Sequence, residues 1–511
     1  MFGIGGLAIV YFIAPILDNM LAKIRLRYIS IIFGILFVIC LSDVIYSNFH
    51  PNIGHGITDY TSYNSITNTT LFWGVFVFSF YIISVIICLY LYLETIFIKF
   101  IFYQCFLLTA TVKKRSNTIQ EEFIMNNTYI SDSIKYIGVD DIDIDLFESQ
   151  YIVPNGVSYN SYLILDEKTA VMDTVDARKT DEWFSNLNSQ LDGRNVDYLI
   201  ISHLEPDHSS NIKNLIDKYP NVKLVLSAKA FAMLPQFFDI ENLSDRCLVV
   251  KDGDELDLGS HKLKFIMAPM VHWPEVMVEY EVSEKILFSA DGFGKFGALS
   301  ADEDWACEAR RYYFNIVGKY GAPVQTLLKK ASPLDIKTIC PLHGPILNAN
   351  LDYYIGKYLT WSSYEPEDEG VLIACASIHG NTKMVAEKLA DILKEKGCKK
   401  VAFTDLARDD MAEAIEDAFR YDKLVLAAAT YDGGVFPPME DFLNRLAHKN
   451  YQKRKIGIIE NGSWAPMAGK SMKSILDGMK DLTYCENMVT IKSTLKDTDI
   501  ASLEALANEL I

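Results

Sequence analysis

The chain has 511 residues, a formal net charge of −18, and 50% hydrophobic residues. This length exceeds what one hydrophobic core organises, so we expect several domains of roughly 100–200 residues each. The acidic charge excludes nucleic acid as the main partner, because binding phosphates requires a basic surface. The nine cysteines include no C-x-x-C pair, which indicates a reducing compartment and excludes a four-cysteine zinc site or a rubredoxin-type iron site.

The apolar residues are concentrated before residue 113. Three runs approach the ~20 residues that a helix needs to cross a bilayer, namely 2–17, 28–46 and 71–93. The loop between the last two runs contains no Lys or Arg, whereas basic residues follow the first run and the third. The positive-inside rule therefore places everything after residue 113 in the cytoplasm. We predict a membrane segment over residues 1–112 and a location at the cell membrane, with cytoplasmic catalytic domains.

Two features of this N-terminal segment stay open. Residues 95–112 are interrupted by Lys99, and we interpret them as an interfacial helix or an extension of the third span; a fourth span would reverse the predicted side. The segment weakly resembles the end of a permease-like bacterial protein. Either it is a true anchor, or two neighbouring genes have been joined and Met125 is the ancestral start of a cytoplasmic product.

After a basic and polar linker at 113–124, the composition becomes that of an α/β protein. Two β-rich runs flank the turn at 166–168, which predicts a hairpin. The strand VDYLIIS is followed by HLEPDH, residues 203–208, and further histidines and an aspartate follow later strands. These residue types at successive strand ends indicate a metal site. The candidate ligands are His203, Glu205, Asp207, His208, His272, Asp291 and His343.

The pattern H-x-E-x-D-H, followed by His, Asp and His, resembles the metallo-β-lactamase-like domain of the flavodiiron proteins. The resemblance implies an αββα sandwich over residues 125–361 with two metals. One metal would be held by His203, Glu205 and His272, the other by Asp207, His208 and His343, and Asp291 would bridge them. Imidazole with carboxylate suits non-haem iron, and the carboxylate of Glu205 favours iron redox chemistry over zinc hydrolysis, although zinc also accepts carboxylate.

A short acidic linker, 362–370, precedes a domain at 371–511 in which strands and helices alternate. This alternation predicts a doubly wound parallel sheet, which binds ligands at the carboxyl ends of its strands. The first of three polar strand ends opens a helix, where free N–H groups can hold a phosphate. This half resembles flavodoxin, which implies that the first loop binds the FMN phosphate and the other two flank the ring. The candidate FMN-binding residues are Ser377, Ile378, His379, Gly380, Asn381, Thr382, Thr430, Tyr431, Asp432, Gly433, Gly434, Asn461, Gly462, Ser463 and Trp464.

Together the two modules, from residue 125 to the C-terminus, resemble the flavodiiron core in an α/β multidomain chain. The resemblance implies reduction of O₂ to water or of NO to N₂O at a diiron site fed by FMN, a head-to-tail homodimer, and a separate electron donor such as rubredoxin. Two alternatives stay open: a zinc-dependent hydrolase with a flavodoxin-like module, and a membrane-anchored electron carrier with an inactive metal pocket. Ligand spacing does not decide between O₂ and NO, because that preference depends on the surroundings of the ligands.

Overall fold

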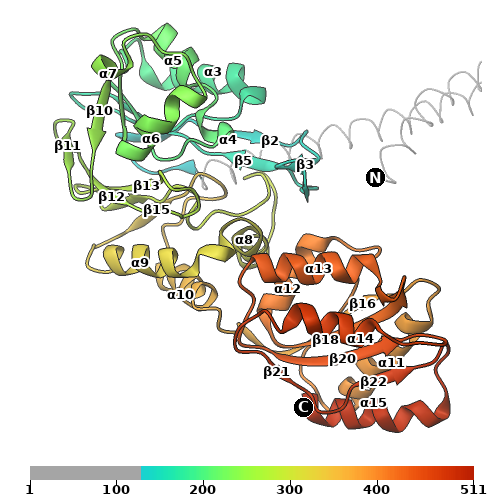
Figure 1. Ribbon diagram of the computed structural model, residues 1–511. Coiled ribbons are helices and arrows are strands. Elements are labelled where there is room, and N and C mark those ends of the chain that lie inside the picture. Colours follow the sequence, from blue (N-terminus) through green and yellow to red (C-terminus); the bar gives the residue numbers. More distant parts are fainter. Residues whose placement is uncertain (1–127) are drawn as a thin grey trace, which may run out of the picture. The chain divides into compact units, whose positions relative to one another are not determined.

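The computed structural model describes residues 128–511. The described part contains a sandwich of two sheets, followed by a single, mostly parallel sheet between two layers of helices (Figure 1). The predicted metallo-β-lactamase-like and flavodoxin-like folds are thereby confirmed. Helix α10 ends at Ser362, the first residue of the linker predicted at 362–370. Strand β16 begins at Asp368, inside that predicted linker. The predicted domain limits themselves stay a prediction.

The sandwich consists of a six-stranded sheet, in the order β1-β6-β7-β8-β9-β10, and a five-stranded sheet, in the order β11 to β15. The six-stranded sheet is made of Ile134–Tyr136 (β1), Tyr162–Ile164 (β6), Ala170–Met172 (β7), Tyr198–Ile201 (β8), Lys223–Ser227 (β9) and Cys247–Val250 (β10). The five-stranded sheet is made of Glu255–Asp257 (β11), Lys262–Met267 (β12), Met277–Glu281 (β13), Ile286–Phe288 (β14) and Thr338–Cys340 (β15). Two small ribbons pair Val139–Asp141 (β2) with Val157–Tyr159 (β5) and Leu146–Phe147 (β3) with Tyr151–Ile152 (β4). Strands β6 and β7 pair antiparallel, which confirms the predicted hairpin.

Helices cover the outer faces of both sheets, with α3, α5, α6 and α7 on one side and α9 and α10 on the other (Figure 1). The helices of this domain are Thr180–Leu191 (α3), Pro206–Ser209 (α4), Ile212–Lys218 (α5), Ala228–Met233 (α6), Leu243–Arg246 (α7), Trp305–Tyr312 (α8), Gly321–Ala331 (α9) and Leu351–Ser362 (α10). Strand β8 shows how the layers form. Leu199 and Ile201 pack in the cluster under the helices, whereas Ile200 packs in the cluster between the sheets. Successive side chains of a strand face opposite sides, so both faces of this strand are apolar and buried.

The second domain has the strand order β17-β16-β18-β20-β21, in which β16, β17, β18, β20, β21 and β22 run parallel. This is the flavodoxin-like doubly wound order. Its strands are Asp368–Ala376 (β16), Val401–Asp405 (β17), Tyr421–Tyr431 (β18), Gly434–Val435 (β19), Lys455–Asn461 (β20), Thr483–Tyr484 (β21) and Val489–Ile491 (β22). Its helices are Asn381–Glu395 (α11), Met411–Arg420 (α12), Pro437–His448 (α13), Ala468–Leu476 (α14) and Asp497–Leu510 (α15).

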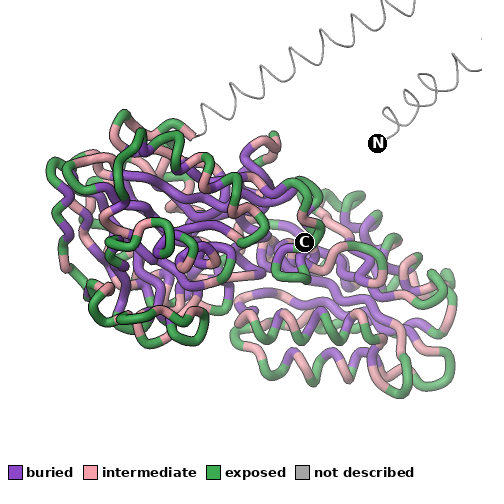
Figure 2. Tube along the Cα trace, turned by 90° about the horizontal axis from the view of Figure 1, so that it is seen from above, coloured by how far each residue is buried: buried purple, intermediate pink, exposed green. Residues whose placement is uncertain are grey.

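Strand β16 is apolar on both faces because it lies between two helical layers. Val371, Ile373 and Cys375 pack with α11 and α15, whereas Leu372 and Ala374 belong to the cluster that includes α12, α13 and α14. The buried strands run through the middle of each domain, and exposed residues are concentrated in the surrounding helices and loops (Figure 2).

The two described domains are joined by an aromatic stack and a buried ion pair. The rings of Phe314 and Phe419 are stacked with their centroids 4.1 Å apart. Arg310 of α8 pairs with Glu416 of α12, and its Nη1 lies 3.1 Å from Oε1 of Glu367 in the connection between the domains. The Arg310 side chain is almost fully buried. This ion pair is therefore shielded from solvent, unlike the many ion pairs on the surface.

The predicted location at the cell membrane is corrected by the structure. No helix between residues 128 and 511 is long and apolar enough to cross a membrane. The longest of them, α11, has 15 residues, which corresponds to about 23 Å against a hydrocarbon core of about 30 Å. The predicted spans at 2–17, 28–46 and 71–93, the ambiguous stretch at 95–112, the linker at 113–124 and Met125 lie outside the described residues.

We predict that Arg310→Ala lowers the free energy of unfolding by about 3–5 kcal/mol, because it leaves the buried Glu416 without a counter-charge. Glu367 keeps Lys357 as a partner at 2.5 Å. Urea unfolding followed by circular dichroism measures this change. The control is Lys213→Ala, which breaks an ion pair with the exposed Asp217 and should cost less than about 1 kcal/mol. Equal effects of the two substitutions would contradict the stabilising role of the buried pair.

Candidate metal centre and flavin site

The seven predicted metal ligands come from loops that follow strands of both sheets. His203 follows β8, Glu205 precedes α4, Asp207 and His208 lie on α4, His272 follows β12, Asp291 follows β14, and His343 follows β15. All but Glu205 are buried. The structure therefore brings together residues that are up to 140 positions apart, since the loops of both sheets meet at one edge of the sandwich.

The first cluster contains His203, Glu205 and His272, with Asp291 beside them. Oε2 of Glu205 lies 3.2 Å from Nε2 of His203 and 3.1 Å from Nε2 of His272. Oδ2 of Asp291 lies 3.0 Å from Nε2 of His272 and 3.5 Å from Nε2 of His203. Two imidazoles and two carboxylates thus converge on one point.

The second cluster contains Asp207, His208 and His343. Oδ2 of Asp207 lies 3.3 Å from Nε2 of both histidines. The other oxygen of Asp291, Oδ1, lies 3.2 Å from Nε2 of His208 and 3.8 Å from Nε2 of His343. One carboxylate therefore faces both clusters, one oxygen to each.

The unpaired atoms of this centre fit two metal ions. Both carboxylate oxygens of Asp207 and of Asp291, and Nε2 of His272, are buried without a hydrogen-bond partner. Although Nε2 of His272 lies only 3.0 Å from Asp291, the two groups form no hydrogen bond. Buried polar atoms are costly unless they are paired or coordinate a cation, and this mixture of imidazole and carboxylate suits iron or zinc.

Two of the imidazoles are oriented by groups outside the clusters. Nδ1 of His203 lies 2.8 Å from Oε1 of Glu275, and Nδ1 of His343 donates to the carbonyl of Ser158 at 2.7 Å. With Nδ1 engaged in this way, the lone pair of Nε2 points into the centre. Glu275 was not predicted from the sequence, although a carboxylate three residues after His272 in MVHWPE was a usable signal.

The charge of the centre keeps Asp291 anionic. Burial by itself raises the pKa of this carboxyl, but His208, His272 and His203 around it lower the pKa well below its ordinary value. An ionised carboxylate can bind a cation through each of its oxygens. Asp291 can therefore bind one metal ion through each of its two carboxylate oxygens.

Aromatic rings surround the centre and limit the access of water. Trp273 packs edge-on against His203 with ring centroids 5.2 Å apart, and Phe147 packs in the same way against His343 at 5.4 Å. Trp273 therefore forms part of the wall of the metal pocket. Trp305 lies in the core against Tyr354 and Trp361.

A cavity of about 570 Å³ lies at the carboxyl ends of β16, β18 and β20. Loops of all three predicted FMN segments line it, and it lies in front of the N-terminus of α11, which has no side-chain cap. The uncapped N–H groups of this helix, with Thr382 and Ser377 beside them, fit a phosphate group. Trp464, at 92% exposure, and Tyr431 stand at the rim.

Thirteen of the fifteen predicted FMN-binding residues line this cavity, and Gly380 and Gly434 do not. Gly380 precedes α11 with a φ of +88°, which side chains rarely adopt, and its N–H donates to Oγ of Ser377. Gly434 lines a neighbouring hollow beside α13 and α14. Four further residues line the cavity and were not predicted from the sequence, because they belong to no phosphate-binding pattern: Ala429, Ala465, Met467 and Ser493.

Comparisons with known proteins cover both domains. Residues 157–344 match the model of the ODP family beta lactamase, and residues 372–481 match that of a flavodoxin domain. An uncharacterized protein of Methanocaldococcus jannaschii is 31% identical over 381 residues, which are 72% of this chain and 94% of that protein. The anaerobic nitric oxide reductase flavorubredoxin of Vibrio vulnificus is 29% identical over 350 residues, 66% of this chain and 70% of that protein.

Solved structures resemble the same part of the chain. The flavodiiron protein from Giardia intestinalis superposes with a TM-score of 0.69 and 26% identity, covering 75% of this chain and 95% of that one. Rubredoxin oxygen:oxidoreductase from Desulfovibrio gigas gives a TM-score of 0.68 and 27% identity, covering 75% and 97%. The two family matches begin at residues 157 and 372, so they give no support to the permease-like resemblance of the N-terminal segment.

A dinuclear metal centre in one domain and a flavin cavity in the next define a metalloflavoprotein with both redox groups in one chain. Its two cofactors are FMN and a non-haem diiron centre, as the sequence predicts. The chain belongs to the flavodiiron protein family.

We predict that Glu275→Gln weakens iron binding by roughly 10–100-fold, because an amide no longer sets the basicity and orientation of His203 as the carboxylate does. Titration of the metal-free protein with ferrous iron measures this affinity. The matched control is Glu279→Gln, at a second buried glutamate that bonds to Ser202 and to no predicted ligand side chain. Loss of affinity in both variants would contradict a specific role of Glu275.

The buried Glu279 has a strongly shifted pKa. Its Oε2 accepts a hydrogen bond from Ser202 at 2.9 Å, and its Oε1 has no partner. Burial, and next the nearby Asp173, raise the pKa of Glu279 well above its ordinary value. Below the ordinary carboxyl pKa, folded and unfolded chains both hold the proton. Above it, the unfolded chain releases the proton while the folded chain retains it, so stability falls as the pH rises towards the folded pKa.

We therefore predict that Glu279→Gln stabilises the protein relative to wild type at pH 8 and has little effect at pH 4. Glutamine cannot ionise, so the difference should grow by up to about 1.4 kcal/mol per pH unit above the ordinary carboxyl pKa. Urea unfolding of both proteins, after the same metal removal, measures it at each pH. A difference that does not change with pH would show that Glu279 titrates normally.

Proposed function

We propose that the chain is an oxidoreductase that reduces O₂ to water, NO to N₂O, or both, with electrons that enter at FMN. The observation that carries this proposal is the placement of Asp291, whose two oxygens face two separate clusters of ligands. Two adjacent metal positions can hold a small oxygen-containing ligand between them. When bound, the irons supply redox chemistry on the gas, and FMN accepts electrons singly or in pairs and passes them on.

We assign one iron to His203, Glu205 and His272, the other to Asp207, His208 and His343, and the bridging position to Asp291. The distances within each cluster support this assignment. Glu205 and Asp207 add negative charge that offsets the charge of ferric ions better than neutral imidazoles could. Glu275 and the Ser158 carbonyl hold two imidazoles in place, and the aromatic rings keep bulk water away.

For the flavin, we assign the phosphate to the loop 377–382 and the ring to the space between 430–434 and 461–464. The uncapped α11 supports the first assignment. The exposed Tyr431 and Trp464 support the second, because aromatic side chains at a rim can pack against a planar ring.

We further propose that a second copy of the chain covers the flavin rim in a head-to-tail homodimer, so that the flavin of one chain serves the diiron centre of the other. Trp464, Tyr431 and Ile378 are exposed together at this rim, and clustered exposed apolar residues mark interaction surfaces. The electron donor is external and of the rubredoxin class, which the names of two relatives support.

The test is a metal and cofactor analysis of the full-length chain, followed by gas consumption. We expect two irons and one FMN per chain, and anaerobically reduced protein that consumes O₂ or NO at a gas electrode; the two rates establish the preferred gas. A colourless, zinc-only protein would overturn the proposal in favour of a hydrolase. Iron and FMN with neither gas consumed would leave an electron carrier with an inactive metal pocket.

A further inference from the structure

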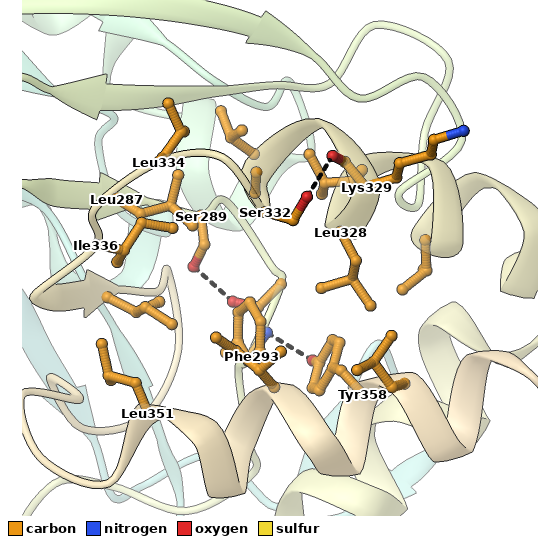
Figure 3. Close-up of a pocket in the computed structure, with 18 of the residues that line it drawn as sticks. Leu287, Ser289, Phe293, Leu328, Lys329, Ser332, Leu334, Ile336, Leu351 and Tyr358 are labelled. Atoms are coloured by element: carbon orange, nitrogen blue, oxygen red, sulfur yellow. Dashed lines mark hydrogen bonds between the residues drawn. The ribbon is translucent and has the colours of Figure 1, made fainter.

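A second cavity of the sandwich lies behind the loop that carries Asp291. It has a volume of about 440 Å³ and lies between the outer face of the five-stranded sheet and the helices α9 and α10 (Figure 3). Leu287, Leu328, Leu334 and Ile336 supply aliphatic wall, and Phe293 and Tyr358 stand beside them (Figure 3). This cavity is separate from the FMN cavity of the second domain, with which it shares no lining residue.

The hydroxyl groups of Ser289, Ser332 and Tyr358 in the wall already form hydrogen bonds within the protein. Oγ of Ser289 donates to the carbonyl of Gly292, and Oγ of Ser332 donates to that of Lys329. The hydroxyl of Tyr358 accepts the N–H of Phe293 at 2.6 Å. A water molecule needs two to four polar partners to stay in a cavity, and these groups offer few. The interior is therefore suited to apolar molecules.

The inner end of the cavity adjoins the diiron centre. Val271 and Gly292 line it and are the immediate neighbours of His272 and Asp291 in the chain. Gly294 of the same loop lies beside a metal ligand, since a Cβ built at this position would lie 3.4 Å from Cβ of His343. One loop of backbone thus separates the cavity from the metal ligands.

The outer end of the cavity reaches the surface. The charged residues in its lining, Lys329, Asp335 and Asp352, are exposed, whereas Val271, Phe293 and Tyr358 are buried. The lining thus changes from charged at the surface to apolar next to the ligands. The rings of Phe293 and Tyr358, both buried, are stacked with their centroids 4.2 Å apart.

We propose that this cavity binds the diatomic substrate gas and supplies it to the diiron centre past Phe293 and Tyr358; the inference rests on the proposed function. O₂ and NO are small and nearly apolar, so they enrich in an apolar space relative to water. An engineered apolar cavity of about 150 Å³ stays dry and binds xenon, and the cavity in this protein is larger. Gas held in this cavity would reach the diiron centre from the side of the loop that carries Asp291. Protons would then reach the centre from its opposite, polar side.

The first test is xenon binding, which is independent of iron, FMN and activity. We expect ¹²⁹Xe NMR of the full-length protein to show saturable binding, and a structure under xenon pressure to place the atom among Leu328, Val324 and Ile339. Leu328→Phe and Val324→Phe should reduce the binding because they fill the space. The matched controls Leu248→Phe and Val249→Phe, at exposed positions of β10, should leave it unchanged.

The second test is the reoxidation of reduced enzyme at varied gas concentrations by stopped flow. In the two filled variants we expect the second-order rate constant for gas to fall by roughly three- to tenfold, with an unchanged limiting rate at saturating gas and unchanged iron and FMN content. Circular dichroism checks folding, and Leu328→Phe, at a half-buried position, serves if Val324→Phe fails to fold.

The outcomes are distinct. A wild-type protein that binds no xenon would overturn the inference, as would filled variants that exclude xenon yet react with gas at the wild-type rate. Xenon binding that is lost in the filled variants together with the slower reaction would support it. A protein that binds xenon but consumes neither O₂ nor NO would overturn the proposed function while still supporting a gas site in the cavity.

Discussion

The carboxylate of Asp291 has to stay ionised in a dry environment and be accessible from two sides. A buried carboxylate is costly unless cations or hydrogen bonds compensate it, and here the compensation comes from imidazoles and metal positions on both sides. Gly294 fits closely into the loop that carries Asp291, because a Cβ at this position would lie 3.1 Å from the carbonyl oxygen of Asp291. The carboxylate of Asp291 is held in place by loops that follow strands of both sheets and by the aromatic rings packed around the centre.

Both cofactor sites follow the same rule of construction. In each domain, buried strands of nearly invariant geometry end in loops that carry the chemistry, so the scaffold fixes the direction of each loop and the loops supply the donor atoms. The difference lies in charge. The metal centre collects carboxylates and imidazoles, whereas the flavin cavity relies on backbone N–H groups and small hydroxyl residues.

Much of this organisation could be predicted from local patterns. The alternation of apolar strands with amphipathic helices indicates both folds, and the spacing in HLEPDH marks the metal site. Contacts between distant segments could not be predicted in this way. Ser158 and His343 are 185 residues apart, and no local pattern connects them. The cavity behind Asp291 depends on how α9 and α10 rest on the sheet, which their sequences alone do not specify. The predicted membrane location was wrong, because no helix between residues 128 and 511 is long and apolar enough to cross a membrane.

The junction at Phe314 and Phe419 has a consequence for how electrons can be controlled. A face-to-face stack beside a buried ion pair opposes sliding between the two domains, since sliding would separate the rings and remove the counter-charge of Glu416. A movement of one domain away from the other would have to break both contacts at once. Control of electron flow by such a movement would therefore cost the free energy of the ring stack and of the buried ion pair.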